Sequence, residues 1–388
     1  MDLDAFAWLL SAEGGRLLER AAAMVADGDP PLRVGERLRR EAGPAEVAAA
    51  LGQVDLRERA VAKFGKDAAR MYFTPDGLEQ ATRAPVAAHR AGRMAAADPT
   101  SVADLGCGIG GDLLAFARAG LTAAGVDLDP LRVAVARANL DALGLPGAVQ
   151  QADATALDLA PFAVVFADPA RRTTSGRSFD PDVWTPPWSF VTGLLARAAC
   201  VKTAPGIPHD LVPEDVEAEW VSDHGEVKEA ALWAGPLATC RRRATVLGDG
   251  GLATLTEEDD PGAQVRDLGT FLYEPDGAVI RAGLVTAVAA GVEGGLVDEH
   301  IAYVTADGAF RTPFARGYRV LETLPYREKQ LRAALAGRGV GPLTIKKRGV
   351  SVVPEELRRR LALTGDVPAT VVLTRIAGKG TALLVEPL

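Results

Sequence analysis

The chain has 388 residues, 48% of them hydrophobic, and a net charge of −8, a composition typical of a soluble globular protein with room for two or three domains. This acidic balance argues against a surface that binds polyanions over its whole area, so a nucleic-acid partner would need local basic patches. No apolar run reaches the length of a membrane span, and the first residues lack the features of a signal peptide. The three cysteines are widely spaced and the four histidines form no ligand-spaced cluster, so we expect a cytoplasmic protein without disulfides or a bound metal.

Residues 1–75 are predicted to form a helical N-terminal domain, because apolar side chains recur there at helical spacing. Thr74 can cap a following helix that has Pro75 at its first position, and that helix is predicted to continue over 76–95. This layout places the loop around Thr74 near the glycine-rich turn described next. Alternatively, the aromatic pair at 72–73 only packs the helical domain on the sheet.

The stretch 101–129 predicts a strand–turn–helix–strand unit. An apolar strand from Val102 to Leu105 leads into four glycines and an amphipathic helix, and a second apolar strand ends in Asp127. Glycines allow positive φ and a close approach of a ligand to the main chain. The start of the following helix offers unpaired N–H groups, and an acid about twenty residues past the glycines can bind ribose hydroxyls. A nucleoside-containing cofactor is therefore expected.

Further βα units continue this pattern up to about residue 256. Alternating strands and helices predict a doubly wound, Rossmann-like α/β sheet with parallel strands covered on both faces. Acidic residues follow several of the predicted strands, at Asp127, Asp153 and Asp168. Because the carboxyl ends of parallel strands converge on the ligand crevice of such a sheet, we expect these side chains to gather there.

The composition changes after residue 250, and the acidic run at 257–260 suggests a domain boundary. We predict a cofactor-binding sheet domain over 76–256 and a C-terminal α+β domain over 262–388. Within the latter, 273–277 is predicted as a turn and 280–290 as one helix. Basic clusters lie at 346–348 and 358–360; they form either one nucleic-acid surface or ordinary charged faces.

Two classes of cofactor fit the glycine-rich turn. Dinucleotide enzymes use G-x-G-x-x-G, which places a pyrophosphate at the helix N-terminus. Here the spacing is G-x-G-x-G from Gly106 to Gly110, with Asp104 two residues before the first glycine. A carboxylate there would oppose a pyrophosphate but suits a cation. S-adenosylmethionine carries a sulfonium and an ammonium group, so it is the favoured cofactor.

Residues 72–206 resemble class I S-adenosylmethionine-dependent methyltransferases, in the trimethylguanosine-synthase-like branch. The resemblance is carried by Thr74-Pro75, by DLGCGIGG at 104–111 and by VDLDP at 126–130. The motifs DPARR at 168–172, VKTAPG at 201–206 and IKKRG at 345–349 resemble the bacterial group that has a C-terminal THUMP-like domain. The resemblance implies Gly106, Gly108 and Gly110 around the methionine moiety, Asp127 on the ribose and Asp153 near the adenine, with Leu128 and Ala154 also in the cofactor site.

The motif that follows the fourth predicted strand departs from the pattern of enzymes that methylate exocyclic amines. Those enzymes have an acid, amide or serine and then Pro-Pro-aromatic, whereas this chain has Asp168-Pro169 and then Ala170-Arg171. The hydrogen-bond acceptor is kept and the stacking ring is lost. We interpret Asp168, Pro169 and Arg171 as the candidate catalytic residues. An arginine at 171–172 or a tryptophan at 184 or 188 could replace the ring, unless the substrate is not a base.

These observations predict an S-adenosylmethionine-dependent methyltransferase whose C-terminal THUMP-like domain selects the substrate. RNA, methylated on a base nitrogen, is the leading substrate. The alternatives are a methyltransferase for a small molecule or a protein, and a non-catalytic RNA-binding protein that retains the fold.

Overall fold

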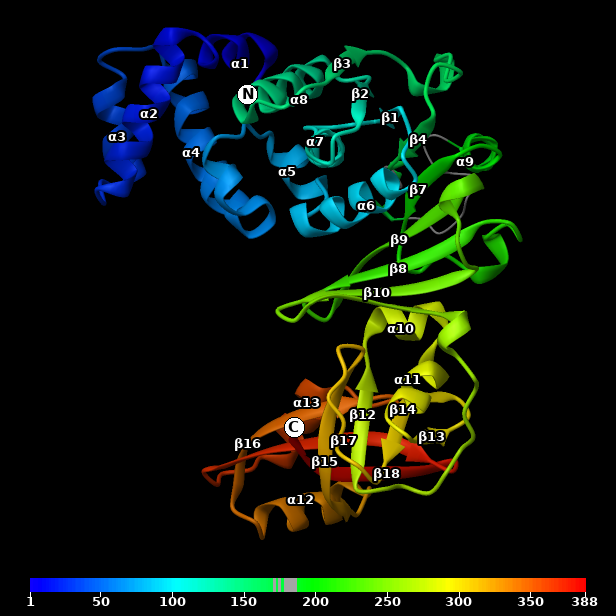
Figure 1. The fold of residues 1–388 in the computed structure, drawn as a ribbon. Coiled ribbons are helices and arrows are strands. Elements are labelled where there is room, and N and C mark those ends of the chain that lie inside the picture. Colours follow the sequence, from blue (N-terminus) through cyan, green and yellow to red (C-terminus); the bar gives the residue numbers. More distant parts are fainter. Residues whose placement is uncertain (170–171, 174–175, 178–186) are drawn as a thin grey trace. The chain divides into compact units, whose positions relative to one another are not determined.

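A computed structural model describes residues 1–169, 172–173, 176–177 and 187–388 of the chain (Figure 1). These residues form two compact units. The first contains 1–203 and 231–239, and the second contains 204–230 and 240–388. Strand β9 (Glu226–Ala234) contributes residues to both units.

The first unit begins with helices that pack around their own apolar core. These are α1 (Leu3–Leu9), α2 (Ala12–Ala26), α3 (Pro31–Leu38) and α4 (Pro44–Phe64). Asp2 and Ser11 cap the first two through their side chains, and Leu17, Leu18 and Leu38 are buried between the helices. The amphipathic spacing read from the sequence therefore corresponds to a real helical core.

The predicted helix over 76–95 is wrong in one respect, because the structure divides it in two. Helix α5 covers Pro75–Gln80 and α6 covers Ala84–Ala96, with an extended residue, Ala81, at the end of α5. Pro85 lies in the first turn of α6, where its missing N–H costs nothing, but it cannot continue a helix from α5. The break leaves Thr82 between the two helices, facing the candidate site described below.

The sheet of the first unit is doubly wound, as predicted. Its strands run in the order β9-β7-β4-β1-β2-β3. The neighbouring pairs β7–β4, β4–β1, β1–β2 and β2–β3 are parallel. The bounds of the additional strands are β1 Ser101–Leu105, β2 Thr122–Asp127, β3 Ala148–Gln151, β4 Val164–Ala167 and β7 Ala199–Thr203. The helices of these units are α7 (Gly111–Arg118), α8 (Pro130–Leu143) and α9 (Trp188–Leu195).

Every residue of β4 is buried, which is typical of a parallel strand covered on both faces. Two short strands, β5 (Arg172–Thr173) and β6 (Gly176–Arg177), pair with each other after β4.

The second unit contains two sheet regions. In one, β8 (Glu217–Asp223), β10 (Arg242–Gly248) and β11 (Gly251–Thr256) run in the order β11-β10-β8-β9, with β10 parallel to β8 and antiparallel to β11. Helix α10 (Gly277–Ala282) packs on β8 and β10, as Figure 1 shows for β10.

The other region is a seven-stranded sheet of the C-terminal part, in the order β13-β14-β12-β15-β18-β17-β16. Its strands are β12 (Phe271–Pro275), β13 (Gly295–Asp298), β14 (Ile301–Ala306), β15 (Ala315–Leu324), β16 (Val340–Lys347), β17 (Val367–Ile376) and β18 (Lys379–Pro387). Helices α12 (Glu328–Ala336) and α13 (Pro354–Leu361) bury Leu331, Leu335 and Leu357 against β16 and its neighbours. This is the expected C-terminal α+β arrangement; the predicted domain boundaries at 75, 256 and 262 remain a prediction.

Two local predictions in this part are wrong. Most of the predicted turn at 273–277 is strand β12. Pairing with β15 through Pro275, and with β14 as far as Tyr273, outweighs the local turn residues. The predicted single helix at 280–290 is α10 followed by α11 (Val285–Gly291). Gly283 ends α10 with a φ of +70°, a conformation that glycine adopts without strain.

Among the helices of the described ranges, none combines the length and apolar character needed to cross a bilayer.

Candidate active site

The strand register brings the candidate residues to one edge of the sheet. Leu105, the last residue of β1, pairs with Val126 on one side and with Ala167 on the other. Ala167 in turn pairs with Val201. The residues that come next are therefore neighbours along the carboxyl ends of the strands: Asp127, Gly106, Asp168 and Lys202. This is the edge at which open α/β sheets bind ligands.

The glycine loop has open space on its ligand side. Gly106 and Gly108 have φ values of +79° and +57°, and a Cβ added at either would have no heavy atom within 4 Å. A ligand can thus lie directly against this main chain. Gly110 is placed differently, because its Cβ would lie 3.5 Å from Ala136 of α8, and its φ of +90° starts α7. Its position indicates a role in seating that helix on α8, and its assignment to the cofactor stays a prediction.

The predicted upstream motif also reaches this loop. Thr74 caps α5 by accepting a hydrogen bond from the Gly77 N–H, at 3.0 Å. A Cβ on Gly77 would lie 2.4 Å from the side chain of Ile109 in the glycine loop, so α5 depends on a glycine to pack this closely. The aromatic residue Phe73 is fully buried and contacts Phe64, which shows that the packing role of the pair also holds.

Asp127 is held by main-chain donors on both carboxylate oxygens. One oxygen accepts from the Gly108 N–H and the other from the Asp129 N–H, each at 3.0 Å. The side chain is 8% exposed. A carboxylate oxygen can accept a further hydrogen bond, so Asp127 is oriented in advance for a pair of hydroxyl groups.

Asp104 is buried in β1, and its Oδ2 has no hydrogen-bond partner among the described residues. Burial raises the pKa of Asp104 well above its ordinary value, and repulsion from Asp112, Asp168 and Asp127 adds to this, while Arg90 opposes it. A buried carboxylate with an unsatisfied oxygen is costly unless a cation or a donor meets it. The ammonium and sulfonium groups of S-adenosylmethionine have the required charge, so the residues present fit that cofactor.

The remaining cofactor candidates lie at the ends of β2 and β3. Asp153 is exposed and accepts hydrogen bonds from both the N–H and the hydroxyl of Thr155, which lowers the pKa of its carboxyl. Ala154 follows it at the start of a short 3-10 helix. Leu128 is an apolar side chain that is 65% exposed. This exposed leucine directly follows the oriented carboxylate of Asp127 and offers an apolar surface for a flat ring such as adenine.

Asp168 has a cationic partner that the sequence analysis did not assign. Lys202, at the end of β7, donates to Asp168 Oδ2 at 2.5 Å and to Thr82 Oγ1 at 3.1 Å. Thr82 donates to Asp112 Oδ2 at 2.8 Å, and Asp112 also pairs with the buried guanidinium of Arg90. Asp168 is therefore part of a connected polar network, with its side chain 29% exposed. The sequence could have indicated Lys202 as a neighbour of Asp168, because Lys202 ends a predicted strand that follows the strand ending at Asp168.

The structure describes the other candidate catalytic residues only in part. Pro169 is buried directly after Asp168. Arg171 and Trp184 lie outside the described residues, and Trp188 is the first residue of α9. The described ranges hold no group of His, Cys, Asp and Glu side chains that could bind a metal ion.

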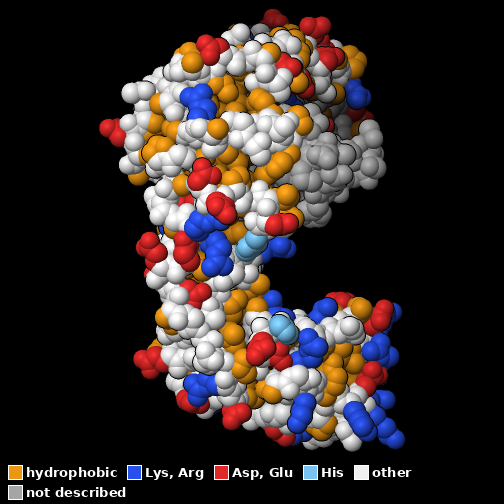
Figure 2. Space-filling model, turned by 90° about the vertical axis from the view of Figure 1, so that its right-hand side faces the viewer, with side chains coloured by type: hydrophobic (Ala, Val, Ile, Leu, Met, Phe, Trp, Pro, Cys, Tyr) orange, Lys and Arg blue, Asp and Glu red, His pale blue; other side chains and the backbone are white. Residues whose placement is uncertain are grey.

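A contrast of charge distinguishes the C-terminal part. Residues 315–387 carry fourteen Lys and Arg against six Asp and Glu, a net charge of +8 in a chain of net charge −8. Ten of the fourteen form no ion pair among the described residues; the four that do are Arg319, Arg338, Lys346 and Arg360. Figure 2 shows Lys and Arg side chains across the surface of this part of the molecule.

Comparison with known proteins agrees with this geometry. The family described as "Methyltransferase domain" matches residues 102–172, "THUMP domain-like" matches 315–387, and a domain of unknown function matches 2–60. The chain is 41% identical to an uncharacterised S-adenosylmethionine-dependent methyltransferase found in two strains of Mycobacterium tuberculosis, over 83% of this chain and 90% of the relative. A crystal structure of a candidate methyltransferase from Porphyromonas gingivalis W83 shares the fold, with a TM-score of 0.74 and 20% identity over 96% of this chain and 98% of that one.

Fold and site thus define a class I methyltransferase with a THUMP-like domain. The chain belongs to the family of S-adenosylmethionine-dependent methyltransferases represented by the mycobacterial relatives, and S-adenosylmethionine is its cofactor. The predictions of fold class, enzyme class and cofactor are confirmed. The assignment of individual site residues stays a prediction.

Proposed function

We propose that this enzyme transfers the methyl group of S-adenosylmethionine to a base nitrogen of RNA. The observation that carries the substrate is the charge contrast, since a segment of net charge +8 in an acidic chain is where a polyanion would bind. The match of the same segment to "THUMP domain-like" supports RNA as that polyanion. RNA would bind at this basic segment only, which agrees with the net charge of −8 of the whole chain.

In the proposed site, each carboxylate has a separate role. Asp104 would hold the cationic amino-acid end of the cofactor, Asp127 the ribose and Asp153 with Leu128 the adenine. When bound, S-adenosylmethionine supplies an electrophilic methyl group on a positively charged sulfur. Asp168 would accept a hydrogen bond from the attacking N–H, aligning the nitrogen lone pair with the methyl carbon.

Lys202 would keep Asp168 in place for this task. Transfer would form the N–C bond as the C–S bond of the cofactor breaks, and the nitrogen would release one proton to solvent. Because Lys202 already occupies one oxygen of Asp168, the second oxygen is the one that would face the substrate. Arg171 would contact the base or its phosphate from the segment that follows.

The test measures methyl transfer from labelled S-adenosylmethionine to total RNA by the purified full-length chain. We expect label in the RNA fraction that is lost after nuclease treatment and absent with Asp168→Ala. Label that survives nuclease, or that follows protein or small molecules on separation, would refute RNA and favour one of the alternative substrates. A wild-type chain that binds the cofactor but labels no RNA would also refute RNA as the substrate.

Charge reversal tests the basic segment. Lys346 is a poor position, since its ammonium is already paired with Glu274 at 2.5 Å. Lys347 and Arg359 are exposed and form no ion pair among the described residues, so Lys347→Glu with Arg359→Glu should weaken RNA binding about tenfold or more and flatten its salt dependence. Arg33→Glu on α3, equally exposed, is the matched control. Unchanged RNA affinity in the double variant would remove this surface from the proposal.

A further inference from the structure

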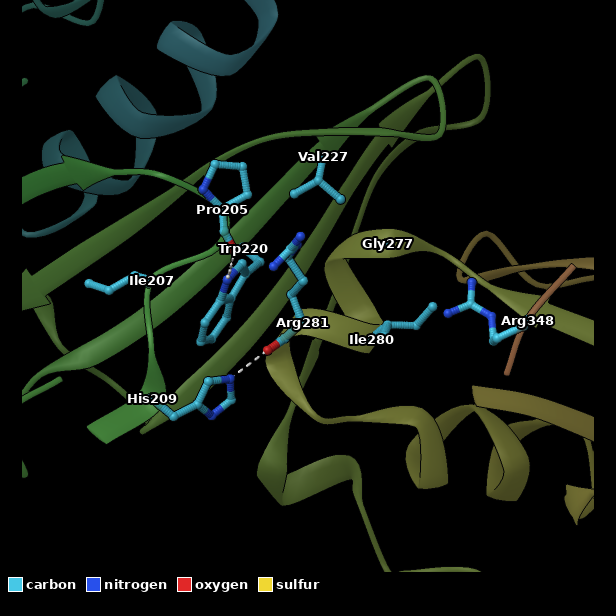
Figure 3. Close-up of a pocket in the computed structure, with 9 residues that line it drawn as sticks. All are labelled: Pro205, Ile207, His209, Trp220, Val227, Gly277, Ile280, Arg281 and Arg348. Carbon is cyan, nitrogen blue, oxygen red and sulfur yellow. Dashed lines mark hydrogen bonds between the residues drawn. The ribbon is translucent and has the colours of Figure 1, made fainter. Parts of the chain in front are cut away.

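The second unit contains a cavity of about 640 Å³ that the donor site does not include. Strand β8, the segment before it and helix α10 form most of its wall, and Arg348 enters from the loop after β16 (Figure 3). Its size lies in the range typical of small-ligand sites. All of the lining residues belong to the second unit.

One wall of the cavity is a rigid aromatic pair. The His209 and Trp220 rings stack with their centroids 4.9 Å apart and an angle of 27°. Trp220 is 1% exposed and donates from its indole N–H to the Pro205 carbonyl at 3.0 Å. His209 Nε2 lies 2.7 Å from the Arg281 carbonyl oxygen, and since a carbonyl only accepts, this nitrogen carries the hydrogen. Both rings are therefore fixed before any ligand arrives (Figure 3).

The same cavity carries two guanidinium groups and no carboxylate. Arg281 and Arg348 both line it, no Asp or Glu does, and neither arginine forms an ion pair within the described ranges. Arg348 Nε is buried and has no hydrogen-bond partner among the residues that the structure describes, and its guanidinium lies 5.5 Å from the Tyr303 ring. Two guanidinium groups in a lining without a carboxylate favour an anionic ligand.

We infer that this cavity binds one nucleotide of the RNA substrate, with its base on the exposed His209 ring, which Trp220 supports by stacking, and its phosphate between Arg281 and Arg348. Guanidinium groups pair with phosphate oxygens through two hydrogen bonds at once, and flat rings are recognised by stacking on aromatic side chains. The apolar side chains of Val227 and Ile280 fill the remaining wall, which suits a ring rather than a second phosphate. This inference rests on the proposed function, because it assigns the nucleotide to RNA.

The test uses calorimetry on the full-length chain with the four nucleoside monophosphates, the matching nucleosides and inorganic phosphate. We expect at least one monophosphate to bind, and its nucleoside to bind about tenfold or more weakly because the charge-assisted hydrogen bonds are absent. Arg281→Ala should weaken the monophosphate about tenfold, and Arg281→Ala with Arg348→Ala should abolish measurable binding. Equal affinity for nucleotide and nucleoside, or binding that survives the double substitution, would overturn the site.

Two controls separate folding from binding. Arg281 holds His209 through its main-chain carbonyl, so Arg281→Ala leaves that hydrogen bond in place. Arg311→Ala removes an exposed arginine that does not line the cavity and should bind the monophosphate like the wild type. Affinity for S-adenosylmethionine should be the same in all of these variants, since the candidate donor residues belong to the first unit.

A competition experiment assigns the source of the nucleotide. A short single-stranded RNA should displace the bound monophosphate, and the double variant should bind that RNA more weakly. Arginine-dependent binding of a monophosphate that RNA does not displace would refute the assignment to RNA. If labelled methyl transfer to RNA fails while RNA still displaces the monophosphate, the cavity is supported and the proposed methylation of RNA is refuted. Methylation that proceeds unchanged in the double variant would refute the assignment of this cavity as the nucleotide site and would leave the proposed methylation of RNA in place.

Discussion

The carboxylates at the two parts of the sheet edge differ in their partners. We call Asp104 and Asp127, which are proposed to hold the methyl donor, the donor side, and Asp168 with Lys202, which are proposed to face the methyl acceptor, the acceptor side. On the donor side, Asp127 is held by two main-chain N–H groups from within a short segment, and Asp104 is buried with an unsatisfied oxygen. On the acceptor side, Asp168 already has a cation, Lys202, which Thr82 and Asp112 connect to the helical segments. The donor side thus has negative charge left for a cationic ligand. The acceptor side offers a positioned hydrogen-bond acceptor instead.

The largest effect is expected from Asp168→Ala. Loss of the acceptor that aligns the nucleophile should lower turnover about 10²–10³-fold, while affinity for S-adenosylmethionine stays within about twofold. Asp168→Asn keeps an acceptor oxygen without the charge, so it should retain more activity if Asp168 orients the nitrogen than if it removes a proton. Single-turnover rates and calorimetry give the two readouts. Asp158→Ala is the control, because this carboxylate accepts from the Ala160 N–H and from no other group in the described ranges. Full turnover by Asp168→Ala would remove this residue from the mechanism.

Asp104→Asn tests the donor side with a change of charge at constant shape. The cofactor's ammonium group loses a charge-assisted hydrogen bond, so affinity for S-adenosylmethionine should fall about tenfold to a hundredfold. Asp129→Asn should have no effect, because Asn also caps α8. Equal affinity of wild type and Asp104→Asn in calorimetry would show that the unsatisfied oxygen does not meet the cofactor.

The same substitution should act in the opposite direction on the stability of the cofactor-free protein. The pKa of Asp104 is raised in the folded state, so the folded chain binds more protons than the unfolded chain, and wild-type stability falls as pH rises from the unfolded value of about 3.9 towards the raised value. Asn does not titrate. The melting temperature of Asp104→Asn minus that of the wild type should therefore increase with pH across this window. A difference that is constant or falls with pH would contradict the burial of an unpaired charge.

The sequence could indicate that Asp104, the glycines and Asp127 lie together, but it could not indicate the network around Asp168, and the reason is physical. Asp104, the glycines and Asp127 lie within one strand–turn–helix–strand unit, where local spacing determines which residues meet. The acceptor network joins Thr82, Asp112, Asp168 and Lys202, which are brought together only by strand order and by the break between α5 and α6. The periodic pattern predicted one continuous helix over 76–95, because Pro85 is the residue in this range that is incompatible with a helix interior.

The C-terminal part shows the same limit. The segment 273–275 looks like a turn because it ends in proline and is followed by Asp276 and Gly277, yet β15 pairs with all of it and β14 pairs with Tyr273. The cavity around Trp220 was also invisible to the sequence analysis, because His209, Trp220 and Arg281 are far apart in the chain and none forms a motif. Pairings between distant segments are decided by tertiary packing, which local residue preferences do not encode.

Lys202→Met tests whether the ion pair between Lys202 and Asp168 affects turnover without affecting affinity for S-adenosylmethionine. Met keeps much of the apolar stem but leaves Asp168 without this cation, so turnover should fall about tenfold through a less well-oriented carboxylate. Lys202 is a positioning residue in this scheme, and Lys202→Arg, which restores a cation, should recover part of the rate. Affinity for S-adenosylmethionine should not change. A loss confined to cofactor affinity would instead assign Lys202 to the donor side.

The smallest effect is expected from Leu128→Ser, which removes apolar surface at the end of β2. If adenine packs on this 65% exposed side chain, its loss should weaken cofactor binding about three- to tenfold, from the apolar area that is no longer buried. S-adenosylhomocysteine has the same adenine, so its affinity should fall by the same factor. Leu252→Ser, a leucine with a similar exposure of 52% on β11, is the matched control. Unchanged affinity for both ligands would mean that the ring binds elsewhere and that the donor side relies on its carboxylates alone.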